Sequence, residues 1–407
     1  MKYIKRDMEA TILEASNYYS ALIITGPRQV GKTTTLQTIA APERGYVTLD
    51  DMDERKLALN DPELFLQLHP APVLIDEVQY APQLFSRIKI AVDSGAAPGS
   101  YWMTGSQAFR LMELAQESLA GRAAILQMTS LSQHEIYGKG VCAPFEIDLS
   151  KLQQRVANGA KADVLSMYNR IWRGSLPGHV GGKYPNRELF YSSYLQTYIQ
   201  RDIGDMVERI DALQFADFVR AAACRAGQML NTHDIAADVG VSDDTAKRWL
   251  RLMEQSGVIF FLRPYSNNLL KRTVKTPKMY FFDTGLVAWL TKYSSPEILM
   301  NGAINGAILE NYVVAEILKS YSNNGLACNA HYYRDKDSRE IDLVLEADGA
   351  LHPMEIKKSA HPGTELTRAF KVLDSAALPR GTGAILCMKE TLSAVDASAL
   401  IVPVWMI

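Results

Sequence analysis

A segment near the N-terminus has the residue types and the spacing of a phosphate-binding loop. Its residues fit the pattern GxxxxGK[ST] and are Gly26, Pro27, Arg28, Gln29, Val30, Gly31, Lys32 and Thr33. The two glycines let the backbone curl, so that successive amide groups can face the phosphate oxygens. We expect Lys32 to reach the β- and γ-phosphates of ATP and Thr33 to hold Mg²⁺, with Thr34 in the first turn of a following helix.

The surroundings of this loop favour a nucleotide site. An apolar run at 21–25 precedes the loop as a strand, and a helical pattern follows it. The alternative is a glycine-containing turn that binds nothing. Lys32 and Thr33 together argue against that alternative, because both are residue types that phosphate and magnesium require.

A pair of acids follows a second apolar run, at 73–76. Asp76 ends this run and Glu77 comes directly after it. Alone, such a pair commonly marks only the end of a strand. Beside a phosphate-binding loop, however, Asp76 is expected in the magnesium shell, and Glu77 is expected to orient and deprotonate the attacking water. Glu77 therefore favours hydrolysis over transfer to another acceptor, and a small-molecule P-loop kinase is the less favoured interpretation.

Three further residues are candidates for contact with the γ-phosphate. Ser106 and Gln107 follow a third apolar run, at 101–104, and can act as sensors there, although a plain turn is the alternative. Arg122 ends the segment SLAGR and can reach the nucleotide of a neighbouring subunit. In that interpretation a homo-oligomer is required for activity. The alternative is an arginine on the surface.

A second set of acids lies near the C-terminus. Residues 339–345 alternate as a strand that carries Asp342, and residues 353–358 form another that carries Glu355 and Lys357. A turn at 348–349 makes the two a hairpin, which places these three side chains on one side. Two carboxylates can hold a divalent metal ion, and a lysine can position or deprotonate a water against a phosphodiester.

An acid also lies on the apolar stripe of the helix predicted over 306–318. Glu310 shares this stripe with Val313, Val314 and Ile317, which should face inward. A buried carboxylate needs a partner, so a metal ion or a lysine is expected beside it. The alternative for the whole set is a hairpin with exposed charges and a glutamate stabilised by the start of its helix.

Residues 231–255 read as a helix-turn-helix. Thr232 and Ser242 are the expected N-caps of its two helices, with Gly240 in the turn between them. In a DNA-binding interpretation, the second helix presents an outward face formed by Thr245, Arg248 and Arg251. Asp243 and Asp244 open that helix and would repel phosphates. A protein-contact or spacer module is the alternative.

The bulk properties predict several domains. The 407 residues are 47% hydrophobic and 22% charged, which is typical of a folded globular chain and not of a disordered one. We expect a P-loop α/β core at 1–135, with buried parallel strands at 21–25, 46–49, 73–76 and 101–104. A helical connector is expected at 136–210, a compact helical unit with strands at 211–290, and a separate α/β unit at 291–407.

Charge and targeting signals limit the partners. A net charge of −2 gives no global attraction to nucleic acid, so contact with DNA would need a local basic patch. The four cysteines are scattered and form no CxxC pair. Because no signal peptide or membrane-spanning run is recognisable, we expect a cytoplasmic protein without a membrane partner.

Several motifs, taken in order, resemble a known family. GPRQVGKTT, LIDEVQ, TGSQ and SLAGR, followed by RPYSNN at 263–268 and KTPKMYFFDTGL at 275–286, look like the AAA-superfamily ATPases that carry a C-terminal domain of unknown function. This resemblance implies an AAA-like ATPase core, a winged-helix middle and a restriction-endonuclease-like C-terminal fold.

The order of the C-terminal acids is similar to that of the PD-(D/E)xK nucleases, which include Holliday-junction resolvases. By this resemblance Glu310, Asp342 and Glu355 are ligands of a second divalent ion, Mg²⁺ or Mn²⁺, and Lys357 is the catalytic base or orienting group. The leading hypothesis is therefore an ATPase that controls a nuclease acting on branched or linear DNA. Its rival is a non-nucleolytic ATP switch whose C-terminal unit only binds nucleic acid or a protein.

Overall fold

The computed structural model describes residues 3–106, 111, 119–199, 211–267, 276–335, 337 and 339–407. The chain divides into two compact units. The first unit comprises Met1–Leu131, Gln255–Gly257 and Ser322–Gly325, and the second comprises Ser132–Glu254, Val258–Tyr321 and Leu326–Ile407. Within the described ranges, no helix combines the length and the apolar character that a bilayer-spanning helix needs.

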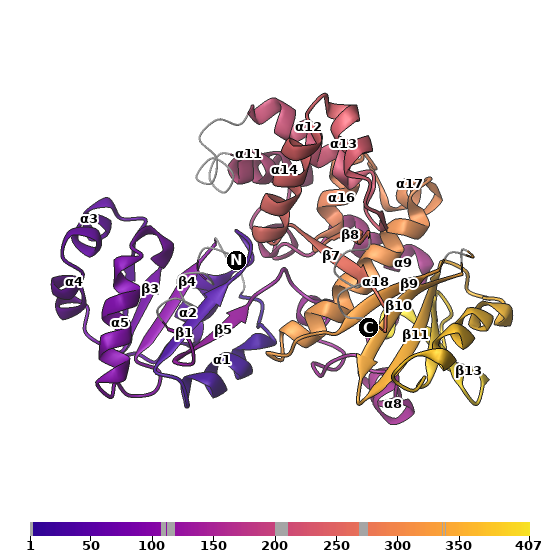
Figure 1. The fold of residues 1–407 in the computed structure, drawn as a ribbon, viewed down its shortest axis with the longest axis horizontal. Coiled ribbons are helices and arrows are strands. Elements are labelled where there is room, and N and C mark those ends of the chain that lie inside the picture. Colours follow the sequence, from indigo (N-terminus) through magenta and orange to yellow (C-terminus); the bar gives the residue numbers. More distant parts are fainter. Residues whose placement is uncertain are drawn as a thin grey trace. The chain divides into compact units, whose positions relative to one another are not determined.

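The first unit is built on a five-stranded parallel sheet with the order β2-β3-β4-β1-β5 (Figure 1). Its strands are β1 (Ala21–Thr25), β2 (Gly45–Thr48), β3 (Val73–Asp76), β4 (Tyr101–Gly105) and β5 (Ala123–Gln127). Its helices include α1 (Met8–Ser16), α2 (Lys32–Ile39), α3 (Met52–Asn60), α4 (Pro62–Leu68) and α5 (Gln83–Asp93), with a short 3-10 turn η1 (Val78–Tyr80). The P-loop-like α/β core expected from the sequence is confirmed.

Burial explains why three strands of the first unit were recognisable in the sequence. Every residue of β1, β3 and β4 is buried, so these strands read as continuous apolar runs. In contrast, β5 lies at the edge of the sheet, and only Leu126 in it is fully buried. β5 was not anticipated from the sequence, although residues 123–126 are apolar, whereas β2 at the other edge was anticipated in spite of its mixed exposure.

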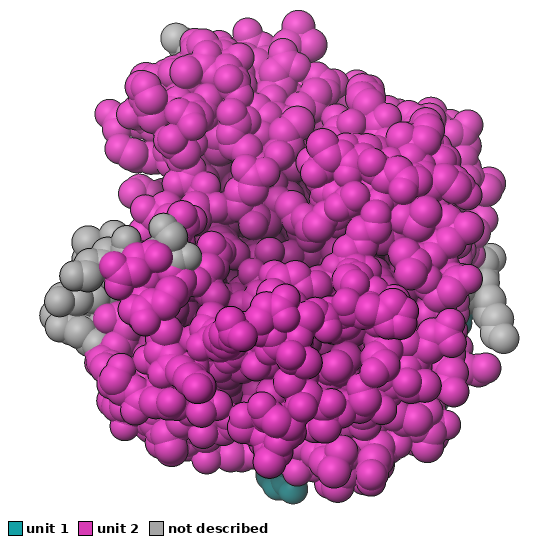
Figure 2. Space-filling view, turned by 90° about the vertical axis from the view of Figure 1, so that its right-hand side faces the viewer, with its two compact units in different colours: residues 1–131, 255–257, 322–325 teal, residues 132–254, 258–321, 326–407 magenta. Residues whose placement is uncertain are grey.

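The second unit combines helices with a long mixed sheet. The helices are α7 (Gln133–Tyr137), α8 (Leu149–Asn158), α9 (Val164–Arg173), α10 (Pro177–Val180), α11 (Arg187–Thr197), α12 (Ala212–Ala223), α13 (Thr232–Val239), α14 (Asp243–Gln255), α16 (Thr284–Leu290), α17 (Pro296–Asn301) and α18 (Asn305–Ser322). The strands are β6 (Gln228–Met229), β7 (Ile259–Pro264), β8 (Lys278–Phe281), β9 (Ala330–Arg334), β10 (Glu340–Ala347), β11 (Ala350–Lys357), β12 (Gly383–Cys387), β13 (Ser393–Asp396) and β14 (Ala399–Pro403), with the 3-10 segments η3 (Thr364–Ser375) and η4 (Val404–Met406). Figure 2 shows the surface of this unit.

One continuous sheet runs through the second unit, with the order β13-β14-β12-β11-β10-β9-β7-β8-β6. The strands of 211–290 join those of 291–407 through β7 and β9, which pair in parallel at Arg263 with His331 and at Pro264 with Tyr332. These two stretches, which the sequence suggested as separate domains, therefore share one backbone hydrogen-bond network. This connection places β8 on the same sheet as the C-terminal hairpin.

The two helices expected at 231–255 are present as α13 and α14, but the N-cap of α13 differs from the expected one. Ser242 caps α14, because its hydroxyl accepts a bond from the amide of Thr245 at 3.1 Å. The cap of α13 is Asn231 and not Thr232, since the Asn231 side chain accepts from the Asp234 amide. An amide oxygen is as effective a cap as a hydroxyl, and both residues precede the apolar stripe, so the sequence leaves the helix start one residue uncertain.

Candidate functional site

The loop between β1 and α2 has the backbone of a phosphate cradle. Gly26 and Gly31 adopt φ values of 141° and 96°, and Gln29 adopts 62°. A Cβ atom added at Gly26 would lie 2.0 Å from the carbonyl oxygen of Met128, so only glycine fits there. The glycines of the motif are thus required by the geometry of the loop itself.

Lys32 lies folded across this loop. It is 7% exposed, and its Nζ donates to the carbonyl oxygens of Gly26 at 2.8 Å and Pro27 at 2.9 Å. Arg6, which the sequence analysis did not single out, also supports the loop: its guanidinium donates to the carbonyl oxygen of Val30 at 2.6 Å. Nothing in the local sequence around Arg6 indicates this contact. In the first turn of α2, the side chain of Thr34 is exposed.

Asp76 accepts hydrogen bonds from hydroxyl groups on β2, on β4 and in the first turn of α2. Its Oδ1 accepts from the Thr33 hydroxyl at 2.8 Å and also from the Thr104 hydroxyl, and its Oδ2 accepts from Tyr46 at 3.3 Å. This contact arises because β4 lies between β1 and β3, so that the carboxyl ends of the three strands meet. The predicted pair of Thr33 and Asp76 is brought together, and Thr104 joins it.

Glu77 has a backbone conformation that is uncommon outside glycine. Its φ is 56°, in the left-handed region, where non-glycine residues often mark functional sites. Its Oε2 accepts from the Gln79 side chain, and its Oε1 lies 4.0 Å from Nη1 of Arg28 in the loop. Gln79 and Arg28 therefore orient the Glu77 carboxylate, and Arg28 belongs to the loop between β1 and α2.

Gln79 is a positioning residue that the sequence analysis missed. It is 1% exposed, and its Oε1 has no hydrogen-bond partner among the described residues. A Cβ atom at Gly105 would lie 2.2 Å from this oxygen, so the glycine that ends β4 makes room for Gln79. The signals that could have revealed the pair are the Gln in LIDEVQ and the Gly in TGSQ.

Three other residues, Ser106, Gln107 and Arg122, were predicted to contact the γ-phosphate. Ser106 is buried, and its hydroxyl has no partner within the described part of the chain. Gln107 lies outside the described residues. Arg122 is half-exposed, and its guanidinium forms an ion pair with Asp93 of its own unit and donates to the carbonyl oxygen of Ala120 at 3.2 Å. An intersubunit role for Arg122 thus requires the Asp93 pair to open.

In the second unit, the C-terminal hairpin brings its predicted side chains together. Lys357 Nζ lies 3.0 Å from Asp342 Oδ2 and 2.7 Å from Glu355 Oε2. The Ile356 amide also donates to Asp342 Oδ2, at 2.8 Å. Pairing of β10 with β9 shifts register between Ile341 and Val344, so an irregularity of the strand lies at Asp342. The two acids and the lysine form a cluster on adjacent strands.

Glu310 of α18 is held by partners from β8. Its Oε1 accepts from Lys278 Nζ at 2.9 Å and from the Tyr280 hydroxyl at 2.6 Å. Lys278 is 3% exposed and also lies 2.7 Å from Oε1 of Glu340. A metal ion or a lysine was expected beside Glu310, and the structure supplies a lysine. Lys278 was missed because it stands far from the acids in sequence, and the motif KTPKMYFFDTGL that contains it does not indicate which acid it contacts.

The charges of this acid cluster influence one another. Burial, followed by the charge of Asp342, raises the pKa of Glu310 and the pKa of Glu355 well above the usual range of a glutamate. Burial opposes the charge of Lys278 and Lys357, but the neighbouring carboxylates outweigh it and raise the pKa of both amines. Both lysines are therefore ammonium groups that partly neutralise the acids.

The separation of the carboxylate oxygens of Glu310, Asp342 and Glu355 shows whether the three residues fit one metal ion. Within the described ranges, Glu310, Asp342 and Glu355 do not bring one oxygen each within 4.8 Å of one another. Ligands of one Mg²⁺ ion lie about 2.0 to 2.1 Å from it, which requires closer oxygens. As these side chains lie, the three carboxylates do not fit a single metal ion, and ammonium groups stand among them.

The outer face of α14 matches the expected surface. Arg248 and Arg251 are exposed and Thr245 is half-buried, while the opposite face packs inward through Ala246, Trp249, Leu250, Leu252 and Met253. Asp243 and Asp244 are exposed as well, and Lys247 lies 3.8 Å from Asp244. The helix thus presents mixed charges to its surroundings.

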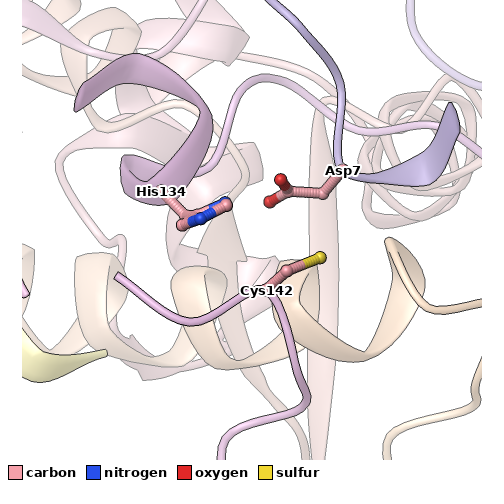
Figure 3. Close-up of side chains that lie close together, drawn as sticks. All are labelled: Asp7, His134 and Cys142. Atoms are coloured by element: carbon pink, nitrogen blue, oxygen red, sulfur yellow. The ribbon is translucent and has the colours of Figure 1, made fainter. Parts of the chain in front are cut away.

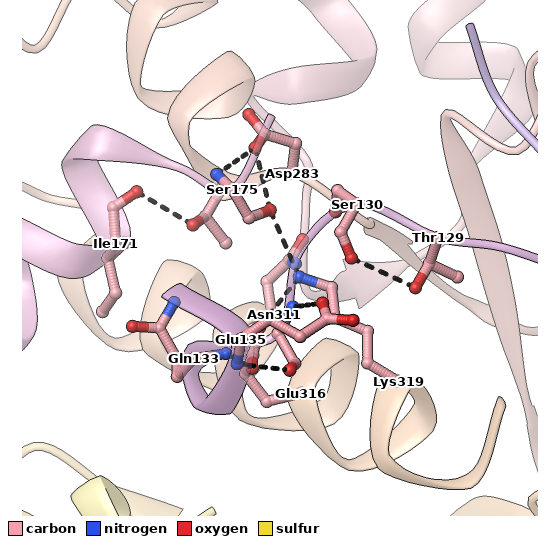
Figure 4. Close-up of polar contacts among 12 residues, drawn as sticks. Thr129, Ser130, Gln133, Glu135, Ile171, Ser175, Asp283, Asn311, Glu316 and Lys319 are labelled. Atoms are coloured by element: carbon pink, nitrogen blue, oxygen red, sulfur yellow. Dashed lines mark hydrogen bonds and ion pairs between the residues drawn. The ribbon is translucent and has the colours of Figure 1, made fainter. Parts of the chain in front are cut away.

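A further polar group is enclosed in the second unit (Figure 4). Lys319 Nζ lies 2.8 Å from Glu316 Oε1 and 3.2 Å from the Ser175 hydroxyl. Ser175 in turn donates to Asp283 through its amide at 2.6 Å, and the Gln133 amide donates to Glu316 at 2.8 Å. These side chains satisfy one another in the interior, which is typical of a structural network that holds helices together.

His134 of α7 and Cys142 on the segment after it also belong to the second unit (Figure 3). Asp7, which Figure 3 draws as well, is part of the first unit. We therefore assign no ligand site to these residues.

Comparisons with known proteins support the assignment of the first unit. Residues 18–137 match a family described as AAA domain. Residues 165–297 and 305–407 match two families described as domains of unknown function, DUF8612 and DUF4143. The sheet and the loop described above agree with the first match, and this part of the chain is similar to AAA domains and has a P-loop-like α/β fold.

Two relatives cover most of the chain. The uncharacterized protein Rv2008c of Mycobacterium tuberculosis is 27% identical over 374 residues, which are 91% of this chain and 77% of the relative. The uncharacterized protein Mb2031c of Mycobacterium bovis has the same identity and coverage.

Solved structures with partial similarity include a Walker-type ATPase of Pyrococcus abyssi, with 14% identity and a TM-score of 0.44, covering 71% of this chain and 96% of that one. A single-substitution variant of RuvB from Thermotoga maritima has 15% identity and a TM-score of 0.28, covering 62% of this chain and 85% of that one.

Proposed function

We propose that the first unit binds ATP with Mg²⁺ and hydrolyses it. The observation that carries this proposal is the contact of the Thr33 hydroxyl with Asp76 Oδ1 at 2.8 Å, directly after a loop whose Gly26 and Gly31 adopt positive φ values. A hydroxyl and a carboxylate in contact at the end of a phosphate cradle are the donor types that magnesium accepts. These two oxygens, together with the loop, match the needs of a triphosphate.

Each neighbouring residue has a role in this reaction. The backbone N–H groups of residues 26–34, other than the proline at 27, and the Lys32 ammonium bind the phosphates, and Lys32 exchanges the carbonyl oxygens of Gly26 and Pro27 for phosphate oxygens. Glu77 takes a proton from the attacking water, while Gln79 holds its carboxylate in position. Magnesium, when bound, neutralises charge that develops on the phosphates.

Arg28 links the phosphate cradle to the base. Its guanidinium lies near Glu77, and a γ-phosphate bound in the loop offers it a second anionic partner. We propose that the choice of Arg28 between these partners adjusts the orientation of Glu77. Ser106 and Gln107 are proposed as the sensor positions next to the γ-phosphate; they follow Thr104, whose hydroxyl donates to Asp76.

We expect phosphate release per chain to rise with protein concentration, because Arg122 is proposed to complete the site of a neighbouring subunit. Arg122→Ala should then lower turnover about 10³-fold at high concentration, the effect of losing an arginine finger. Light scattering with and without ATP should show the matching change in size. Arg87→Ala, at an exposed arginine paired with Glu63, is the control. Turnover that is independent of concentration and of Arg122 would leave the arginine as a surface ion-pair partner of Asp93.

A second candidate function, that of a nuclease acting on branched or linear DNA, concerns the second unit. It is favoured by the cluster of Asp342, Glu355 and Lys357, which has the residue types of a phosphodiester-cleaving site. The helices α12 to α14 with strands β6 to β8 have the element order of a winged helix, which we propose as the DNA-contacting part. The rival is a non-nucleolytic ATP switch whose second unit binds nucleic acid or a protein.

The nuclease and the non-nucleolytic switch are distinguished by incubating the full chain with labelled branched and linear DNA. Mg²⁺ or Mn²⁺ is added, and the reaction is run with and without ATP. Cleavage that Lys357→Ala abolishes would support the nuclease. Lys371→Ala is the control, because Lys371 is exposed on η3 of the same unit. Cleavage that Lys357→Ala retains would reject this cluster as the site, and no cleavage under any condition would favour the switch.

A further inference from the structure

Lys278 is a buried cation that neither proposed reaction uses. It stands at the start of β8, directly after the segment 265–277 that joins β7 to β8. Its side chain is 4% exposed, yet its ammonium lies 2.9 Å from Glu310 and 2.7 Å from Glu340. A lysine is retained in such a place only when carboxylates compensate for the water it has lost. The position therefore has a strong preference for a positive charge.

The sheet fixes this ammonium in place. Lys278 pairs through its backbone with Leu262 of β7 and with Met229 of β6, so strands on both sides hold it. The ring of Tyr332 lies 5.6 Å from its Nζ, which adds a cation–π contact. Because the backbone of Lys278 is paired on both sides, its side chain cannot move away from Glu310 without also losing its contacts with Glu340 and Tyr332.

We propose that Lys278 is the resident cation of the C-terminal acid cluster and that its ammonium keeps a divalent metal ion away from Glu310. The inference rests on the same cluster as the nuclease candidate, but it holds whether or not that cluster cuts DNA. It explains why Glu310, Asp342 and Glu355 do not converge on one point: two lysines divide the acids between them, Lys278 taking Glu310 and Lys357 taking the other two.

The charges and donors at Glu310 support this proposal. Its Oε1 already accepts two hydrogen bonds, from Lys278 and Tyr280. A divalent ion bound to that oxygen would lie within a few ångströms of the ammonium, and the two positive charges would repel each other strongly in a poorly solvated site. Metal and ammonium therefore compete for one carboxylate.

The test is to measure Mn²⁺ binding by the full chain with electron paramagnetic resonance. Every protein carries Asp76→Asn, which removes the proposed magnesium ligand of the first unit. Lys278→Met keeps most of the aliphatic length but removes the charge, and it should tighten Mn²⁺ binding at least about tenfold, the scale on which neighbouring groups alter metal affinity. Lys278→Arg keeps the charge and should show no gain.

Two further proteins decide where any new ion binds. Adding Glu310→Gln to Lys278→Met should remove the gain, since the proposed ligand is lost. Lys247→Met, at an exposed lysine on α14, should behave like the parent. A parent protein that binds Mn²⁺ as tightly as the Lys278→Met protein would overturn the proposal, and so would a gain that survives Glu310→Gln.

A second measurement covers the case in which Lys278→Met does not fold. Any rise in the melting temperature of the parent with millimolar Mn²⁺ should then be the same after Glu310→Gln, because only metal bound at Glu310 would add a rise that this substitution removes. A rise that Glu310→Gln removes would show that Lys278 does not exclude the ion. A failed DNA-cleavage assay leaves these results unaffected, which separates this inference from the nuclease candidate.

Discussion

Glu77→Gln is expected to keep ATP binding while lowering kcat by about 10²- to 10⁴-fold, the usual contribution of a positioned general base. The substitution preserves the size of the side chain and its acceptor oxygen, so the contact with Gln79 can persist in part. It removes the negative charge that would draw a proton from water. Binding should be measured by calorimetry with Mg²⁺ and ATP, and turnover by phosphate release.

Two variants make the Glu77 result specific. Glu63→Gln changes an exposed glutamate of the same unit, whose partner is Arg87, and should leave both measurements unchanged. Gln79→Leu removes the side chain that orients Glu77 and should lower kcat by less than Glu77→Gln does, with ATP affinity preserved. If Glu77→Gln turned over ATP at the original rate, another group would have to be the base.

Lys32→Ala is expected to abolish measurable ATP binding at ordinary concentrations. The Lys32 ammonium is one of two positive charges in the motif, beside Arg28, and each charge-assisted hydrogen bond contributes about 1.5 to 3 kcal/mol. Losing two phosphate contacts therefore weakens binding by about 100-fold or more. The carbonyl oxygens of Gly26 and Pro27 also lose their donor, so the loop becomes less well ordered. Calorimetry with Mg²⁺ and ATP measures this loss directly.

The matched control is Lys56→Ala, because Lys56 is exposed on α3 of the same unit and its nearest charge partner is Asp53 at 3.8 Å. Circular dichroism should show that both variants keep the fold of the parent. Unchanged ATP affinity in Lys32→Ala would remove the loop from the nucleotide site and, with it, the first proposed function.

Much of the candidate nucleotide site was recognisable from local sequence patterns. Gly26, Lys32 and Thr33 lie in one contiguous motif, and Asp76 ends an apolar strand, so each was recognisable from its neighbours in sequence. The contacts of Thr33 with Asp76 agree with that expectation. Thr104 and Gln79 stand in the motifs TGSQ and LIDEVQ, but their contacts with Asp76 and Glu77 depend on the order of strands β1, β4 and β3, which the motifs alone do not specify.

In the C-terminal cluster, the sequence predicted which acids lie together but not the partner of Glu310. Alternation along the hairpin correctly predicted that Asp342, Glu355 and Lys357 share a side, since the period of a strand is two residues. The stripe of α18 correctly predicted that Glu310 needs a partner. The identity of that partner, Lys278, depends on β8 lying in the same sheet as the hairpin, and this in turn depends on the pairing of β7 with β9.

The amino-acid sequence by itself determined the phosphate-binding loop, the buried strands and the facing of the C-terminal acids, because these depend on backbone geometry and on periods of a few residues. Only the tertiary structure decided which cation neutralises Glu310 and which side chains aim Glu77. Those contacts join segments that are distant in the chain. The free energy of these contacts depends on how deeply the side chains are buried and on which charges lie beside them. Both are set only when the sheets assemble.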